Sequence, residues 1–399
     1  MSSNRLHFRT PLFTTPFHVR TAAANKHNAW APWAGYTTAL HFGDATMEYT
    51  ALRNQAGLYD LSPMVKYEIS GPDALRYLNR LTLRDVSKLQ PGTVHYTAWC
   101  DDAGKLIDDG TLFHISPGRY RLCCQERHLP WLQDSAIGFT VTIRDESEEV
   151  AGLSLQGPCS YSVLASAGFG EASRLKPFQL TEVPFGSGKL MISRTGFTAD
   201  LGYELWTSLD NAIPLWDHLM EKGALHGLRP IGTTALNMAR IEAGFMIANM
   251  DFVSATTALR PDRLRSPYDM GLEWMIDFAK GPFNGRAALK RERDTGNTQW
   301  AFVGLDIDGN VEAEHALIYD NKKTEVGHIT ASLWSPTVKR NIALAMLRRP
   351  YHDAKSGNLW VEIYALRELE YHKLMVKAAV VPRQFFNPPR RRANPPGPF

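Results

Sequence analysis

The sequence predicts an α+β protein that consists of two similar lobes followed by a small antiparallel β-barrel. Two stretches echo each other: "SGPDALRYL" places Gly71 and Pro72 before a helical run, and "QGPCSYSVL" does the same with Gly157 and Pro158. From Trp300 onward the pattern changes to short β-rich runs that are separated by turns. A chain of 399 residues has room for two or three such domains.

Composition divides the chain into four regions. Residues 1–45 are turn-rich and aromatic, and we expect them to fold over the body. Residues 46–290 are predicted to form the two lobes, and residues 291–385 the barrel. Residues 386–399 are basic and proline-rich, which predicts an extended, solvated tail.

Three further helices are predicted within the lobes from their apolar periodicity. The first lies in "EYTALRNQAG" and is expected to end with Gly57 as its C-terminal cap. The second lies in "NAIPLWDHLMEKGALHG". The third lies in "IGTTALNMARIEAGF", where Thr233 is the expected N-terminal cap.

Charge and cysteine content narrow the class of partner. The chain has 44 Lys and Arg against 41 Asp and Glu, so the balance favours a small-molecule partner over nucleic acid or an anionic membrane. Its four cysteines form no C-x-x-C pair, which argues against a metal site and for a reducing compartment. The first residues lack the apolar run of a signal peptide, so we expect a cytoplasmic protein.

The chemistry is expected to rest on carboxylates. No G-x-G-x-x-G opens a helix, and neither a P-loop nor G-x-S-x-G occurs, so dinucleotide, nucleoside-triphosphate and serine-hydrolase functions lose weight. "LIDD" places Asp108 and Asp109 in a strand, where one of two adjacent side chains must point inward. A buried carboxylate is costly unless it is paired or functional. Glu204 in "GYEL" is a second carboxylate in a strand-like segment, so the same reasoning applies to it.

The segment "ARIEAGF" adds two charged residues to an otherwise apolar helix. Arg240 is expected to form an internal ion pair. Glu242 is expected on a solvated face, because residues two apart on a helix do not face each other.

These pieces resemble the tetrahydrofolate-dependent aminomethyltransferase family, which includes the T protein of the glycine cleavage system. "SRTGFTADLGYEL" resembles the family signature, and seven other motifs follow the family order between about residues 30 and 385: "WAGY", "GLYDLSPM", "LIDD", "LQGP", "ARIEAGF", "PFNGRAAL" and "SPTVKRNIALAML". The resemblance implies a cloverleaf of two related α+β lobes and a C-terminal β-barrel around a central folate channel.

The resemblance also implies roles for individual residues. Glu204 would grip the pterin, since a carboxylate can accept two parallel hydrogen bonds from the ring N–H and the exocyclic amine. Phe197 replaces the usual tyrosine of the family and would stack on the ring. Asp109 matches the catalytic aspartate, which would stabilise developing positive charge or move a proton. Three further residues match positions near the folate: Tyr96, Arg240 and, in the basic tail, Arg390.

The donor side departs from the T protein. Pro63 stands in "DLSPM" where that protein has histidine, "ANMDF" keeps only Asp251 of a polar set, and "CCQERH" around Cys124 replaces an asparagine-containing segment. These changes argue against a lipoyl-carried aminomethyl donor. An aromatic cluster would suit a cationic methylated donor or an aromatic methyl ether; its residues include Trp33, Tyr36, His41 and Trp99, with Trp30 and Phe42 beside them in the sequence.

The leading hypothesis is a tetrahydrofolate-dependent demethylase that moves a methyl or methylene group from a small N-, O- or S-methylated donor. One alternative is an aminomethyltransferase T protein, which requires a lipoylated carrier protein as partner. Another is a folate-binding maintenance protein without turnover. Relatives of that last kind carry K-G-C-Y-x-G-Q-E, whereas this chain has "PFNGRAALKRE" and keeps Asp109.

Overall fold

The computed structural model describes residues 12–353 and 358–395. Its first elements form a small layer on one of the two lobes, which is called lobe one and described below. Residues 1–11 of the predicted N-terminal segment lie outside the described residues. Phe17 of this layer is fully buried in the core of lobe one, and Arg20 pairs with Asp217 at 2.6 Å. The layer contains a three-stranded sheet and one helix: β1 (Phe13–Thr14), α1 (His18–Ala24), β2 (Trp30–Trp33) and β3 (Tyr36–Ala39).

Lobe one is built on a six-stranded mixed sheet with strand order β11-β12-β13-β10-β4-β14. Its strands are β4 (Ala56–Asp60), β10 (Val150–Gln156), β11 (Leu180–Phe185), β12 (Gly188–Ser193), β13 (Gly202–Ser208) and β14 (Leu228–Pro230). Its helices are α2 (Ala45–Asn54), α5 (Ser160–Ser166), α6 (Ala212–Gly223) and α7 (Thr233–Ala243).

Lobe two is built on a five-stranded antiparallel sheet with strand order β6-β7-β8-β5-β9. Its strands are β5 (Val65–Ser70), β6 (Thr93–Cys100), β7 (Leu106–Ser116), β8 (Arg119–Cys124) and β9 (Thr142–Asp145). Its helices are α3 (Ala74–Leu81) and α4 (Leu129–Ser135).

The predicted repeat is confirmed. Each Gly-Pro pair lies directly between a strand and a helix, between β5 and α3 in lobe two and between β10 and α5 in lobe one. Gly71 and Gly157 have φ values of +124° and +118°, which side-chain-bearing residues rarely adopt. A Cβ atom on either glycine would also lie within 3 Å of a backbone oxygen, 2.8 Å from Thr140 O or 2.6 Å from Gln55 O.

Two helix ends differ from the prediction. Helix α2 ends at Asn54, and Gly57 lies inside β4, where an added Cβ would meet the side chain of Ile231 at 2.9 Å. Gly57 is therefore needed for close packing and is no helix cap. The N-cap of α7 is Gly232, and Thr233 is the first helical residue.

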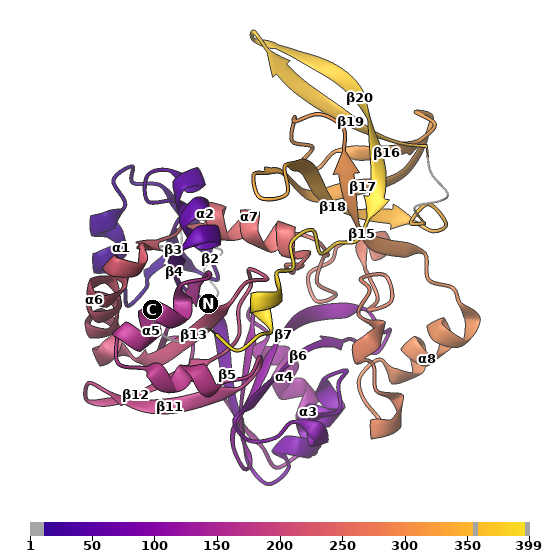
Figure 1. Cartoon of the computed structure of the whole chain (residues 1–399). Helices are drawn as coiled ribbons and strands as arrows, with labels where there is room; N and C mark the ends of the chain where they lie inside the picture. Colours follow the sequence, from indigo (N-terminus) through magenta and orange to yellow (C-terminus); the bar gives the residue numbers. More distant parts are fainter. Residues whose placement is uncertain (1–11, 354–357, 396–399) are drawn as a thin grey trace, which may run out of the picture.

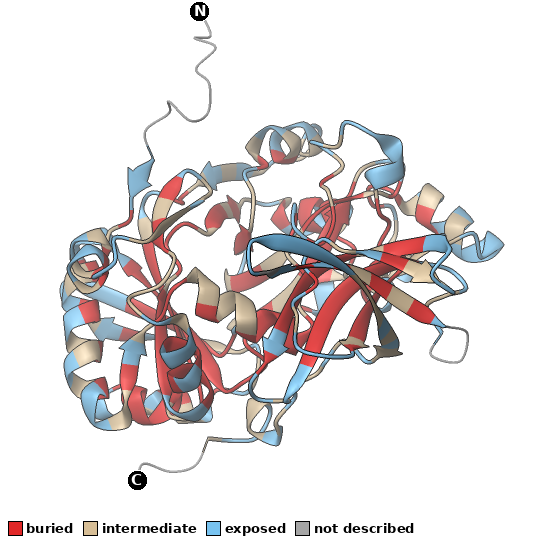
Figure 2. Ribbon diagram, turned by 90° about the horizontal axis from the view of Figure 1, so that it is seen from above, coloured by how far each residue is buried: buried red, intermediate tan, exposed pale blue. Residues whose placement is uncertain are grey.

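The C-terminal region is a closed antiparallel barrel, as predicted, with strand order β15-β18-β17-β16-β19-β20 (Figure 1). Its strands are β15 (Trp300–Ile307), β16 (Leu317–Asp320), β17 (Thr324–Ser335), β18 (Arg340–Arg348), β19 (Leu359–Arg367) and β20 (Glu370–Val381), and α8 (Arg286–Thr295) precedes them. Figure 2 shows that buried residues follow the sheets of the lobes and the barrel strands, whereas the far end of the β19–β20 hairpin is exposed.

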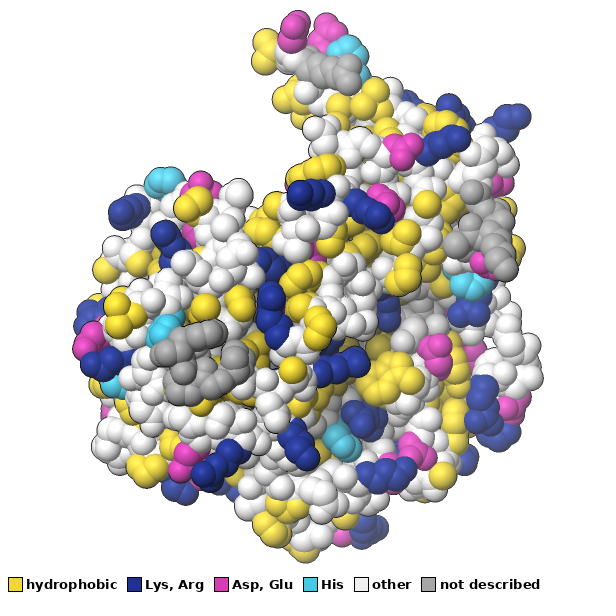
Figure 3. All heavy atoms as spheres, in the orientation of Figure 1, with side chains coloured by type: hydrophobic (Ala, Val, Ile, Leu, Met, Phe, Trp, Pro, Cys, Tyr) yellow, Lys and Arg dark blue, Asp and Glu magenta, His cyan; other side chains and the backbone are white. Residues whose placement is uncertain are grey.

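The segment after β20 is not a solvated tail, in contrast to the prediction. It returns from the barrel to lobe one, and we call its residues 382–395 the C-terminal strap (Figure 1). Figure 3 shows Lys and Arg side chains gathered along the middle of the face that the strap crosses. Within the described ranges, no helix is long and apolar enough to cross a membrane.

Candidate functional site

Asp109 lies on β7, between β6 and β8, where it is opposite Ala98. Its carboxyl group accepts a hydrogen bond of 2.8 Å from the hydroxyl of Tyr96, which lies on the neighbouring strand β6. Burial raises the pKa of Asp109 to about 8, and the charge of Asp108 contributes to the same shift. A carboxyl group with this pKa carries a proton at neutral pH and can exchange it near that pH.

The two adjacent aspartates have different surroundings, as the alternation of strand side chains requires. Asp109 is partly exposed, whereas Asp108 is fully buried and lies 2.9 Å from Nε2 of His128. Asp108 therefore points away from Asp109 and has His128 as its partner. A substitution of Asp108 would leave His128 without its partner in the core.

Glu204 lies on β13, opposite Ser154 of β10 and Ser193 of β12. Its side chain is buried, and one carboxylate oxygen accepts a 2.6 Å hydrogen bond from the hydroxyl of Thr195. Burial raises the pKa of Glu204 to about 7, with the Thr195 bond acting in the opposite direction. Glu204 has no ion-pair partner among the described residues, so it is available to a ligand that donates hydrogen bonds.

The end of β8 (Arg119–Cys124) lies near both of these carboxyl groups. Burial raises the pKa of Cys123 to about 12, and Glu204 contributes to that shift. Burial also raises the pKa of the neighbouring Cys124, and Asp109 contributes there. Electrostatic effects fall with distance, so Glu204 and Asp109 both lie near these two adjacent residues.

An aromatic pair joins the loop between β12 and β13, which carries Phe197, to the segment after α7, which carries Phe245. Phe197 stacks on Phe245 with ring centroids 5.4 Å apart and an interplanar angle of 27°. The guanidinium of Arg391 in the C-terminal strap lies 5.3 Å from the centre of the Phe245 ring. Phe197 is half-buried, so part of its ring remains open to contact.

Arg240 is fully buried and pairs with Asp251 at 2.6 Å, as the prediction of an internal ion pair required. It also donates to Asn237 Oδ1 at 2.8 Å and to the carbonyl of Phe245 at 3.1 Å. Its Nη2 has no hydrogen-bond partner among the described residues. A buried donor without a partner is rare, so a bound ligand could satisfy this group, and the expected folate contact stays a prediction.

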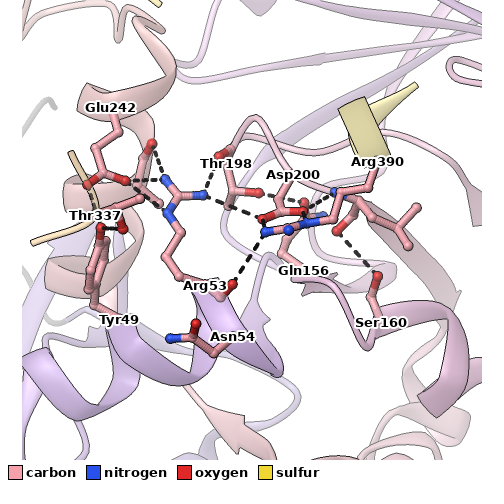
Figure 4. A network of polar contacts seen from close by, with 12 residues as sticks. Tyr49, Arg53, Asn54, Gln156, Ser160, Thr198, Asp200, Glu242, Thr337 and Arg390 are labelled. Carbon is pink, nitrogen blue, oxygen red and sulfur yellow. Dashed lines mark hydrogen bonds and ion pairs between the residues drawn. The ribbon is translucent and has the colours of Figure 1, made fainter. Parts of the chain in front are cut away.

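Arg390 is engaged within the protein. Its guanidinium forms two hydrogen bonds to the carboxylate of Asp200, at 2.6 and 2.8 Å (Figure 4). Two parallel bonds of this kind are among the stronger polar contacts in proteins. Arg390 therefore anchors the C-terminal strap to lobe one, and its predicted contact with folate remains untested.

Arg53 and Glu242 form the centre of the network in Figure 4. Glu242 is fully buried, which corrects the expectation of a solvated face; it accepts bonds of 2.6 and 2.9 Å from Arg53 and further bonds from Tyr49 and Ser335. The Phe386 ring of the strap covers the Arg53 guanidinium at 4.2 Å. This network ties α2, α7, the barrel and the strap together.

The four aromatic residues predicted to bind the donor do not form one cluster. Each is next to a different ring: Trp33 is 6.2 Å from Tyr59, Tyr36 is 5.8 Å from Phe13, His41 is 5.6 Å from His27, and Trp99 is 5.8 Å from His128. Trp99 is fully buried in the core of lobe two and Tyr36 is nearly so. The other two are half-buried, and donor binding by any of the four stays a prediction.

Three residues that matter to the site carry no clear signal in the sequence: His128, Arg53 and Arg383. Of these, only His128 lies in a motif named above, "CCQERH". Arg383 of the strap donates a hydrogen bond to the carbonyl of Met270 at 2.9 Å. Burial lowers the pKa of Arg383, and Tyr96 is the main group that acts against this shift. The partners of these residues are distant in the chain, so no local pattern could have found them.

Comparison with known proteins shows that the chain is a transferase of one-carbon groups. The chain belongs to the glycine cleavage T-protein family, whose members carry out folate-dependent one-carbon transfer. Residues 18–280 match the family described as the GCVT N-terminal domain, and residues 301–387 match the Glycine cleavage T-protein C-terminal barrel domain.

Relatives of known name share most of the chain. The aminomethyltransferases of Bacillus subtilis and Geobacillus thermodenitrificans are 30% and 31% identical, over 89% and 95% of this chain and 94% and 98% of theirs. The trimethylamine-oxide aldolase of Ruegeria pomeroyi is 31% identical over 86% of this chain and 43% of its own length. A crystal structure of glycine cleavage system aminomethyltransferase T from Bartonella henselae has the same fold, with a TM-score of 0.82 at 22% identity over 94% of this chain and 98% of that one.

Replacing Glu204 by alanine is expected to weaken tetrahydrofolate binding. Loss of one charged partner of a paired hydrogen bond costs roughly 1.5–3 kcal/mol, which corresponds to about 10- to 150-fold in affinity. Calorimetric titration of the purified variant measures this change, and its melting temperature should stay near that of the parent. Glu182→Ala is the matched control, because Glu182 is exposed on β11 of the same sheet and, among the described residues, pairs with Lys189. Equal affinity of Glu204→Ala and parent would remove Glu204 from the site.

Proposed function

We propose that this protein is a tetrahydrofolate-dependent demethylase that moves a methyl or methylene group from a small N-, O- or S-methylated donor to tetrahydrofolate. The observation that carries the proposal is the Asp109 carboxyl group, which is held by Tyr96 and has its pKa raised to about 8 by burial. Tetrahydrofolate supplies a nucleophilic nitrogen, N5, whose proton must leave when the one-carbon group is attached. In its ionised form, which becomes more populated as pH rises through about 8, Asp109 can take that proton.

Each residue of the proposed folate site would make a different contact with the ligand. Glu204 would accept two hydrogen bonds from the pterin, and Phe197 would lie against its ring. Arg240 has a free Nη2 donor near Asp251 and can satisfy an acceptor on the ligand. This donor set fits a flat, polar heterocycle with donors and acceptors on its edge.

The donor end favours a free cationic molecule. Pro63 replaces the histidine of the T protein, and neither Asp109 nor Glu126 forms an ion pair within the described part of the chain. The ionised form of either carboxyl group attracts a quaternary ammonium or sulfonium donor. In methyl transfer, the bond from the methyl carbon to the donor nitrogen or sulfur breaks, its electron pair stays with the donor, and the carbon bonds to N5, whose proton passes to Asp109. Methylene transfer requires a donor whose carbon is already at that oxidation level.

The names of relatives support two donors. The trimethylamine-oxide aldolase of Ruegeria pomeroyi acts, by its name, on a methylated amine oxide, which favours a small methylated compound. The two aminomethyltransferases support the second candidate, a T protein that takes its aminomethyl group from a lipoylated carrier protein. A maintenance protein without turnover is the weakest candidate, because Asp109 is retained in the environment of an acid–base group.

A screen without carrier protein tests the proposal. The purified protein is mixed with tetrahydrofolate and methylated amines, sulfonium compounds or aryl methyl ethers, and 5-methyltetrahydrofolate or 5,10-methylenetetrahydrofolate is measured by mass spectrometry. Turnover with at least one free donor is expected. Turnover with lipoylated carrier alone would establish the second candidate in its place.

A further inference from the structure

Asp108 makes three polar contacts within lobe two, next to the proposed catalytic carboxyl group of Asp109. Its Oδ1 accepts a 2.8 Å hydrogen bond from the backbone N–H of Asp109. Its Oδ2 accepts a 3.2 Å bond from the backbone N–H of Glu126 and lies 2.9 Å from Nε2 of His128. Asp108 is fully buried, so each of these contacts replaces water that the carboxylate has lost.

His128 is held as firmly as its partner. Only 4% of the residue is exposed, and its backbone N–H donates to the Tyr67 hydroxyl at 2.8 Å. The edge of its ring meets the Trp99 ring nearly at a right angle, 86°, with centroids 5.8 Å apart. Neither ring can turn without disturbing the core, so the imidazole stays aimed at Asp108.

We propose that Asp108 and His128 form a positioning pair, which fixes the backbone that carries Asp109 and sets the charge beside the Asp109 carboxyl group. The inference rests on the proposed function, because it assigns the pair to the reacting carboxyl group of that function. Asp108 acts through the backbone bond at 2.8 Å and through its charge, and His128 acts through Asp108.

Asp108 places a negative charge next to the Asp109 carboxyl group, and its contact with Nε2 of His128 offsets part of that charge. Without this contact, the charge of Asp108 acts more strongly on Asp109, which then keeps its proton to a higher pH. The other groups that act on Asp109 or the pair come from several elements: Tyr96 of β6, Cys124 of β8, Glu126 before α4, Tyr67 of β5 and Asp251 after α7.

The pair makes a prediction of opposite signs that a purely structural role does not make. Asp108→Asn removes a negative charge, so the midpoint of Asp109 titration should fall by about one pH unit or more. His128→Ala removes the hydrogen-bond partner that offsets part of the Asp108 charge, so the midpoint should rise by roughly half a unit. A packing defect alone would shift both variants in the same direction or in neither.

Carbon-13 NMR of protein labelled at the aspartate side-chain carboxyl carbon measures these midpoints. The Asp109 signal is assigned by its absence from Asp109→Asn, and Asp102→Asn, at an exposed turn position, is the control without a shift. His128→Gln keeps a hydrogen-bond donor toward Asp108, so its midpoint should lie closer to the parent than that of His128→Ala while it melts near the parent. Asp108→Asn keeps the size of the side chain and an acceptor oxygen, so it carries the test if His128→Ala fails to fold.

Midpoints within about 0.3 pH unit of the parent in all folded variants would overturn the positioning pair. The titration needs no donor, so a failed demethylation screen leaves its result unaffected. Conversely, opposite shifts in a protein that demethylates no donor would support the pair and reject the proposed function.

Discussion

Asp109→Asn should lower the turnover rate by about 10²-fold or more, the usual scale for loss of a positioned acid–base or electrostatic group. Asparagine keeps the size of the side chain and an acceptor for the Tyr96 hydroxyl, but it cannot take a proton. Tetrahydrofolate affinity should change less than about tenfold, because the pterin is proposed to be held by Glu204. Steady-state kinetics with the donor found in the screen, together with calorimetric titration, separates the two effects.

The pH dependence gives the same assignment a second check. The raised pKa means that Asp109 ionises as pH rises through about 8, so the rate of the parent should increase over that range. The rising limb should be absent from Asp109→Asn. Asp102→Asn, in the exposed turn before β7, should keep both the rate and the limb. An Asp109→Asn variant with a rate close to the parent would end the catalytic assignment.

Glu242→Ala should lower the free energy of unfolding by about 3–5 kcal/mol, because it leaves the buried guanidinium of Arg53 without its carboxylate. The nearest other carboxylate, that of Asp200, is 4.0 Å from Arg53 and already binds Arg390. Urea unfolding followed by circular dichroism and by tryptophan fluorescence measures the loss, provided the two transitions coincide.

Glu221→Ala is the matched control for this experiment. Glu221 lies on the surface of α6 and pairs with the adjacent Lys222, so its removal should change stability by no more than about 0.5 kcal/mol. A Glu242→Ala variant that unfolds at the same urea concentration as the parent would show that Arg53 finds water or another partner. The network in Figure 4 would then not hold the domains together.

The architecture was predictable because it rests on local patterns. The Gly-Pro pairs at Gly71 and Gly157 predicted the repeated strand-to-helix entry, and the structure has it at both places. The change to β-rich runs at Trp300 predicted the barrel. Asp109 and Glu204 were predicted as site residues because burying a carboxylate in an apolar strand costs free energy unless it is paired or functional. Both lie where burial raises their pKa.

The polar contacts around the site were not predictable in the same way. Glu242 looked solvated because the helix pattern gives only its neighbours on α7, whereas its partner Arg53 is 189 residues earlier in the chain. Asp200 and Arg390 are 190 residues apart. Proline and arginine content predicted that the C-terminal strap is an extended, solvated tail, because composition does not reveal that Arg390 has a carboxylate partner, Asp200, in lobe one.

The C-terminal strap also bears on how the protein is made. Ribosomes release a chain from its N-terminus, and domains fold in that order. Lobe one, including Arg53 and Asp200, can therefore fold before residues 386–393 have been synthesised. Until Phe386 covers Arg53 and Arg390 reaches Asp200, both buried charges lack a partner that they have in the finished protein. Completion of this polar network thus comes after the folding of lobe one.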